Sequence, residues 1–257
     1  MLTRRAFFGG ACCLLHAGPA LAEKRSRPRF ICATSDEKWL EPGEIPMAQA
    51  SLYPLERWTP NHNFTRDQRL ITPNVGFMGG TREQKRTVQR FASEWIGGGL
   101  EKHIRFVFDT SLERSHIRVS FKKNGGNVSE VGARADHVPK SKPTMNLADL
   151  TRRAILHEFG HALGLRHEHH HPEAGIVWNR PAVLARYREH GWSDKKIEEN
   201  VFRRFNKTHS CNGSAFDPDS VMLYPFDREL TLNGVASKLN EHISRGDRRC
   251  LIRTYSA

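Results

Sequence analysis

Residues 157–167 read His-Glu-Phe-Gly-His-Ala-Leu-Gly-Leu-Arg-His, which places three imidazoles and one carboxylate in a single short stretch. Apolar residues recur at helical spacing up to Leu163, so the first half of the stretch is predicted to be an α-helix. His157 and His161 are four residues apart and therefore project from one face of that helix. Two imidazole nitrogens at this spacing suit a tetrahedral zinc ion, which binds each at about 2.1 Å.

The residues around these two histidines complete the pattern. Glu158 lies one position round the helix, beside the open side of such a metal, where its carboxylate can take a proton from a metal-activated water. Gly164 can adopt the left-handed conformation that ends a helix, which lets His167 return as a third nitrogen ligand. Three protein ligands leave one position open, as in a catalytic zinc site. Asp149 is the predicted N-terminal cap of the helix.

A second motif lies downstream, where residues 220–225 read Ser-Val-Met-Leu-Tyr-Pro. Together the two motifs resemble those of the metzincin zinc metalloproteases, in which a Met-turn underlies the zinc. Tyr224, two positions after the methionine, and Glu168, directly after the third histidine, resemble the astacin branch of that clan. A more diffuse resemblance runs from about Trp58 to the C-terminus.

This resemblance implies both a fold and an activity. The implied fold is an α+β metzincin-like zincin. It has a twisted, mostly parallel sheet with an antiparallel edge strand, an active-site helix below it, and a mostly irregular or helical C-terminal subdomain. The implied activity is that of a zinc-dependent endopeptidase with Glu158 as general base, Tyr224 as a catalytic residue that stabilises the oxyanion, and Met222 as an apolar floor. The implied cofactor is Zn²⁺, and its ligands are His157, His161 and His167.

Substrate binding is expected along one edge of the sheet. Residues 128–133 and 144–147 are predicted to be two short strands before the zinc helix, and the resemblance puts the first of them at the upper rim of the cleft. An exposed edge offers unpaired backbone groups, so a peptide or protein substrate can bind there in extended form. A plain surface hairpin is an equally good interpretation of residues 128–133.

The N-terminus has the features of a cleaved export signal. Arg4 and Arg5 precede an apolar run, and Ala20-Leu21-Ala22 is the small-x-small pattern that a signal peptidase cuts. Residues 3–8 also resemble a twin-arginine signal. We therefore expect residues 1–22 to be a signal peptide and the mature chain to be exported to the periplasm or the extracellular space.

The remaining chain divides into two parts. Residues 58–257 are the expected catalytic domain, and the proline-interrupted residues 23–57 are an N-terminal extension, a linker or a propeptide. Some metzincins occupy the zinc with a pro-region cysteine or aspartate; Cys32 and Asp36 are available here, although neither lies in a motif of those families. Without the signal three cysteines remain, so at most one intramolecular bridge can form, and Cys211 with Cys250 is the candidate pair.

Other functions fit parts of the sequence. A zinc-binding but non-catalytic secreted protein would have no use for Glu158, whereas a zinc hydrolase of a non-protein amide such as cell-wall peptide has the same motifs.

The formal charge of +12 falls to +10 without Arg4 and Arg5. Because the basic residues are dispersed without interleaved aromatics, we expect no nucleic-acid partner. No membrane partner is expected either, and the chain is expected to be monomeric. Residues 169–171, three further histidines, could recruit a second metal, but we interpret them as exposed loop residues.

Overall fold

The computed structural model describes residues 32–34, 57–59, 70–205 and 215–256. The predicted signal peptide (residues 1–22), Asp36 and Cys211 lie outside these residues. Among the described residues no helix combines the length and apolar character needed to cross a membrane.

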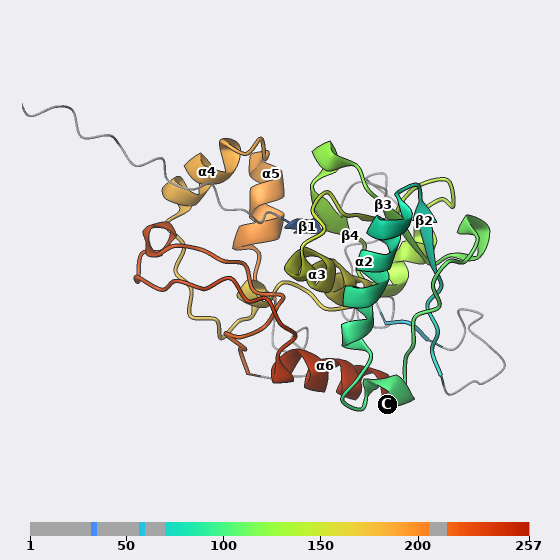
Figure 1. Ribbon diagram of the computed structural model, residues 1–257. Coiled ribbons are helices and arrows are strands. Elements are labelled where there is room, and N and C mark those ends of the chain that lie inside the picture. The colour runs from blue at the N-terminus through green and yellow to red at the C-terminus, as the bar shows by residue number, and fades with distance from the viewer. Residues whose placement is uncertain (1–31, 35–56, 60–69, 206–214, 257) are drawn as a thin grey trace, which may run out of the picture.

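A five-stranded mixed sheet forms one layer of the molecule (Figure 1). Its strands, in spatial order, are β1 (Cys32–Thr34), β4 (Asn127–Ser129), β5 (Met145–Asn146), β3 (Ile117–Ser120) and β2 (Val75–Met78). β2, β3 and β5 run parallel, and β4 is antiparallel to β5, as expected for the fold. The predicted edge strand is shorter than residues 128–133 and is not outermost, because β1 pairs with it in parallel.

The described residues form five α-helices, and their sequences explain most of their ends. They are α2 (Arg82–Ala92), α3 (Arg152–Ala162), α4 (Arg180–Arg188), α5 (Asp194–Ile197) and α6 (Arg245–Tyr255). Capping boxes at Thr81 and Ser244 begin α2 and α6. The predicted Asp149 cap of α3 is wrong: Thr151 caps the helix, and Asp149 instead accepts a hydrogen bond from the Thr151 amide.

Short helical turns connect these elements. The 3₁₀ turns are η2 (Ser93–Trp95), η3 (Leu100–Lys102), η4 (Leu112–Arg114), η5 (Lys123–Gly125), η6 (Gly132–His137), η7 (Glu168–His170) and η10 (Arg228–Leu230). The segment η8 (Glu198–Phe202) is a π-helical turn that continues α5.

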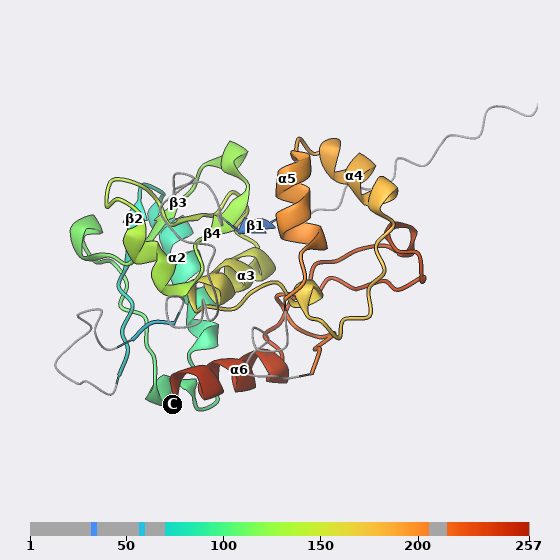
Figure 2. The same cartoon turned by 180° about the vertical axis from the view of Figure 1, so that it is seen from behind.

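α3 lies at the centre of the molecule, with the sheet and α2 on one side and α4 and α5 on the other (Figures 1 and 2). Two tryptophans bind it to the rest of the core: Trp95 Nε1 donates to Leu156 O at 2.9 Å, and Trp58 Nε1 donates to Ala162 O at 2.8 Å. Phe159 packs edge-on against Phe106. Because α3 is buried from Arg153 to Ala162, the side chains it presents are held rigidly.

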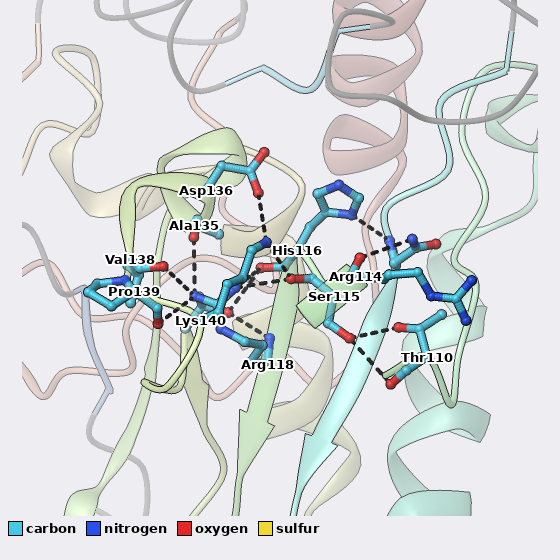
Figure 3. A network of polar contacts seen from close by, with 12 residues as sticks. Thr110, Arg114, Ser115, His116, Arg118, Ala135, Asp136, Val138, Pro139 and Lys140 are labelled. Carbon is cyan, nitrogen blue, oxygen red and sulfur yellow. Dashed lines mark hydrogen bonds and ion pairs between the residues drawn. The ribbon is translucent and has the colours of Figure 1, made fainter. Parts of the chain in front are cut away.

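A buried arginine organises the loop between β4 and β5 (Figure 3). Arg118 on β3 is fully buried, and its guanidinium donates to backbone carbonyls on both sides of the loop, including Lys142 O at 2.8 Å and Val138 O at 2.8 Å. Burial lowers the pKa of Arg118, and the nearby Asp136 and Glu130 carboxylates act in the opposite direction. Arg118 therefore fixes the loop that connects β4 to β5.

Candidate metal centre

Three histidines converge beside the Met-turn, as the sequence predicted. His157 and His161 come from consecutive turns of α3, and His167 follows the bend after the helix. The Nε2 atom of His161 lies 3.2 Å from His157 Nε2 and 3.1 Å from His167 Nε2. All three rings are buried.

The hydrogen bonds of the other ring nitrogens test whether this cluster fits a metal. His157 Nδ1 lies 2.8 Å from Val221 O, and His161 Nδ1 lies 2.8 Å from Leu165 O. A carbonyl can only accept, so both Nδ1 atoms carry the proton and both Nε2 atoms present lone pairs. Lone pairs that face each other across 3.2 Å repel unless a cation lies between them, and two ligands of a tetrahedral zinc ion are about 3.4 Å apart. The residues therefore fit the expected metal.

The bend that returns His167 depends on Gly164. Its φ of 97° is in the left-handed region, as predicted. The Leu165 amide donates back to Gly160 O at 2.9 Å, which closes the helix end. The Glu168 amide then donates to Met222 O at 3.1 Å, so the third histidine is fastened to the Met-turn.

The Met-turn lies close beneath α3. Met222 is 1% exposed and lies against Gly160 of the helix, where an added Cβ would be 2.4 Å from its Sδ atom. Asp247 on α6 holds the turn from the other side, because its carboxylate accepts from Ser220 Oγ at 2.6 Å and from the Val221 amide at 3.0 Å. The glycine in the histidine motif thus permits the close approach of helix and turn.

Arg153 also connects α3 to the Met-turn, a role that the sequence analysis missed. Its buried guanidinium donates to Leu223 O at 2.9 Å, to Val221 O at 3.3 Å and to Asn240 O. Burial lowers its pKa to about 10. A charged residue four positions before His157 gives no sequence signal beyond its position on the buried helix face.

Glu158 has the environment expected of a general base. It is fully buried, and within the described residues neither of its carboxylate oxygens has a hydrogen-bond partner. Burial raises the pKa of Glu158 to about 8, although the neighbouring Cys32 and Arg153 side chains act to lower it. A carboxyl with a pKa near neutrality can both accept and return a proton.

Tyr224 lies against the histidines. Its ring centroid is 4.3 Å from that of His167 and 6.1 Å from that of His157. Its hydroxyl donates to the backbone carbonyl of Cys32 on β1. The ring is thus placed beside the cluster, while the hydroxyl contacts the N-terminal strand.

Comparisons with known proteins agree with this geometry. The family model described as Astacin, a peptidase family, matches residues 82–245. The chain belongs to the astacin family. Among solved structures, one of myroilysin is 32% identical over 72% of this chain and 93% of that chain, with a TM-score of 0.64. A second myroilysin structure is 30% identical over 73% of this chain and 84% of that chain, with a TM-score of 0.52.

A more distant relative shares the fold alone. High choriolytic enzyme 1, a hatching-enzyme zinc-protease from the medaka fish Oryzias latipes, is 17% identical over 82% of this chain and 99% of that chain, with a TM-score of 0.55. No curated protein sequence gives a significant match. Membership of the astacin family makes the protein a zinc metalloendopeptidase whose substrates are peptides or proteins.

One further residue joins the metal cluster of this astacin-family protein. The Sγ atom of Cys32 and the ligand nitrogens of His157, His161 and His167 all lie within 4.8 Å of one another. Cys32 is fully buried and forms no disulfide. Of the two N-terminal candidates for reaching the metal, Cys32 lies at the site and Asp36 is outside the described residues. Cys250 is disulfide-bonded, and its predicted partner Cys211 is also outside them.

The interpretation of residues 169–171 as exposed is wrong, because all three histidines are buried. His169 packs on Tyr224 with ring centroids 4.4 Å apart, and its Nε2 lies 2.9 Å from Asn200 O. His171 Nδ1 accepts from the Glu173 amide at 3.0 Å. His169 supports the ring of Tyr224, His170 packs on Phe205 and His171 on Phe216, long-range packing roles that three adjacent polar residues do not signal. His167, His169 and His170 also lie close enough together to hold a metal, but His167 directs its Nε2 into the first cluster.

Proposed function

We propose that this astacin-family protein hydrolyses peptide bonds with His157, His161 and His167 holding the zinc and Glu158 acting as the general base. The observation that supports this most directly is the convergence of three imidazole Nε2 atoms on one point, with a fully buried carboxylate on the same helix. A structural zinc site would fill the fourth position with protein and would need no base.

The bound zinc would polarise the scissile carbonyl and lower the pKa of a water molecule. Glu158 would accept the proton from that water on its carboxylate and later donate it to the leaving amine. Its raised pKa suits both steps. Tyr224 would donate its hydroxyl to the developing oxyanion, and the ring stack on His167 and His169 would limit where that hydroxyl can go.

The substrate would bind in extended form along the outer edge of β4. This is the edge on which β1 now lies, and it faces away from β5. Backbone pairing would supply affinity with little sequence preference, so side-chain specificity would come from the cleft beyond the strand.

The N-terminal segments would serve transport and maturation. Residues 1–22 would be a signal peptide, with export by the twin-arginine route, and residues 23–57 a propeptide ahead of the catalytic domain at 58–257. N-terminal sequencing of the exported protein tests the first boundary, and a first residue other than Glu23 would contradict it.

Glu158→Gln tests the proposed chemistry. The amide has nearly the same shape but cannot accept the proton, so turnover of a peptide should fall by about 10²–10⁴-fold. Zinc content, measured by atomic absorption, should stay at about one ion per chain because Glu158 is not a ligand. Unchanged turnover in this variant would refute the assignment of the base, whereas loss of zinc would show that Glu158 belongs to the ligand set.

A further inference from the structure

Three buried imidazoles carry ring nitrogens that the proposed reaction does not use. His167, His169 and His170 lie in or directly before η7 and are at most 3% exposed. Among the described residues, no hydrogen-bond partner reaches Nδ1 of His167, Nδ1 of His169 or either ring nitrogen of His170. A buried polar atom left without a partner costs about 1–3 kcal/mol. Several such nitrogens in one place therefore point to a ligand that they bind in common.

The hydrogen bond that His169 makes shows which of its nitrogens can bind a cation. Its Nε2 lies 2.9 Å from Asn200 O, and a carbonyl can only accept, so Nε2 carries the proton and Nδ1 has the lone pair. His170 lies near the same carbonyl without a hydrogen-bonding geometry, and a neutral imidazole leaves one nitrogen unprotonated in either tautomer. The two rings pack edge to face with centroids 4.2 Å apart. His169 and His170 can therefore offer lone pairs to one cation.

His167 supplies a third nitrogen. Its Nε2 faces the first cluster and its Nδ1 reaches no described acceptor, whereas Nδ1 of His157 and of His161 each lie 2.8 Å from a carbonyl. A metal-bound histidine usually donates its second nitrogen to an acceptor, so His167 is an exception. One ring nitrogen from each of His167, His169 and His170 lies within 4.8 Å of the other two. Two nitrogens bound to one ion at about 2.1 Å are up to about 4.2 Å apart, so a small movement of the rings brings them onto one ion.

The donor atoms determine the class of cation. The group consists of imidazoles alone, which suit transition metals such as Zn²⁺ and Cu²⁺ and not Mg²⁺ or Ca²⁺. The guanidiniums of Arg166 and Arg203 lie over the ring of Phe205, which packs on His170. Their positive charge opposes a cation, and no carboxylate belongs to the group to offset it. A metal should therefore bind here more weakly than at the first cluster.

We propose that His169, His170 and the Nδ1 atom of His167 form a second metal site, which binds Zn²⁺ more weakly than the first. His167 then bridges the two ions as an imidazolate, and the proton of its Nδ1 atom passes to the solvent. The second ion also fixes the ring of His169, on which Tyr224 packs. The site thus connects the concentration of free zinc to the position of the proposed oxyanion donor. This inference rests on the proposed ligands of the first ion, but metal content tests it without any need for catalytic activity.

Metal counting in the full chain tests the assignment. The protein, purified without a polyhistidine tag, is dialysed against buffers of increasing free Zn²⁺ concentration, and the bound zinc is measured by mass spectrometry. We expect a tight first ion and a weaker second ion in the wild type. His169→Gln and His170→Gln should keep the first ion and bind the second at least roughly 10-fold more weakly, because even an outer partner of a metal ligand contributes about 10–100-fold.

His171→Gln is the matched control. It removes an imidazole from the same run, but one that lies outside the three-ring group and accepts from the Glu173 amide. This variant should bind both ions as the wild type does. A second ion that binds equally well in His169→Gln and His170→Gln, or that is lost to the same extent in His171→Gln, overturns the proposal. So does a wild-type chain that binds one ion only.

Anomalous diffraction at the zinc edge gives a readout on the wild type that does not depend on how the variants fold. Crystals soaked in Zn²⁺ should show one peak at the first cluster and a second among the rings of His167, His169 and His170. A second peak elsewhere, or none, overturns the proposal. Two ions in a chain that hydrolyses no peptide would refute the proposed function and leave the second site in place.

Discussion

The hydroxyl of Tyr224 is the smallest feature on which the proposed chemistry depends. Tyr224→Phe keeps the ring on His167 and His169 and removes only the oxygen. In the enzyme without its proposed propeptide, turnover should fall by roughly 10²-fold with little change in KM, because an oxyanion contact forms mainly in the transition state. Steady-state kinetics on one peptide check this, with a melting curve as control. A variant that keeps full turnover would reduce Tyr224 to a packing role.

A single buried charge holds the Met-turn to α3. Arg153→Met removes the donor that Val221 O, Leu223 O and Asn240 O share. Val221 O keeps its bond from His157 Nδ1, but the other two carbonyls lose the donor, and a buried carbonyl left without a partner costs about 1–3 kcal/mol. We expect a loss of about 3 kcal/mol or more in the free energy of unfolding, measured with urea.

The adjacent arginine provides the control for this substitution. Arg152 forms a half-exposed pair with Glu94, and such surface pairs are worth about 0–1 kcal/mol. Arg152→Met should therefore cost far less than Arg153→Met. Equal losses would mean that the Met-turn does not depend on Arg153.

At the scale of the helix, α3 and the Met-turn approach closely because residue 160 is a glycine and has no Cβ. Gly160→Ala would normally stabilise a helix by about 1 kcal/mol. Here the new Cβ would lie 2.4 Å from Met222 Sδ and 3.1 Å from Trp95 Cζ2, and overpacking of this kind costs about 1–3 kcal/mol.

The expected result of Gly160→Ala is thus a lower melting temperature, with the metal site disturbed. Gly97→Ala is the matched control: its φ is not positive, and its Cβ would meet no atom closer than 3.8 Å. A Gly160→Ala variant as stable as Gly97→Ala would show that Met222 can move away at no cost.

At the scale of the whole molecule, the histidine cluster joins α3, the bend after it and the Met-turn, so metal should stabilise the entire fold. A site filled to about 1,000 times its dissociation constant adds about 4 kcal/mol. Removal of zinc by a chelator should therefore lower the melting temperature measured by calorimetry. Zn²⁺ should restore it and Mg²⁺ should not, because Mg²⁺ prefers oxygen ligands. An identical melting temperature with and without metal would contradict this coupling.

The local parts of this molecule could be predicted from the sequence, and the long-range parts could not. The spacing of His157, His161 and His167 around Gly164 follows from helix geometry, and the structure brings the three together as expected. β1 has no sequence pattern, because three residues are too few to show a period and their partners lie almost a hundred positions away. The buried contacts of Arg153 and of residues 169–171 were not predicted for a related reason. The side chains and backbone that cover them come from distant segments of the chain.

Asp247 links α6 to the Met-turn. The same carboxylate caps α6, through the Ser244 amide at 2.9 Å, and holds Ser220 and Val221. The first turn of α6 therefore supports the Met-turn. A chain that ends prematurely, before α6 is synthesised, lacks the acceptor for the amide of Val221, the residue whose carbonyl accepts from His157. Metal capture would then have to await the synthesis of α6, which delays the appearance of a functioning hydrolase.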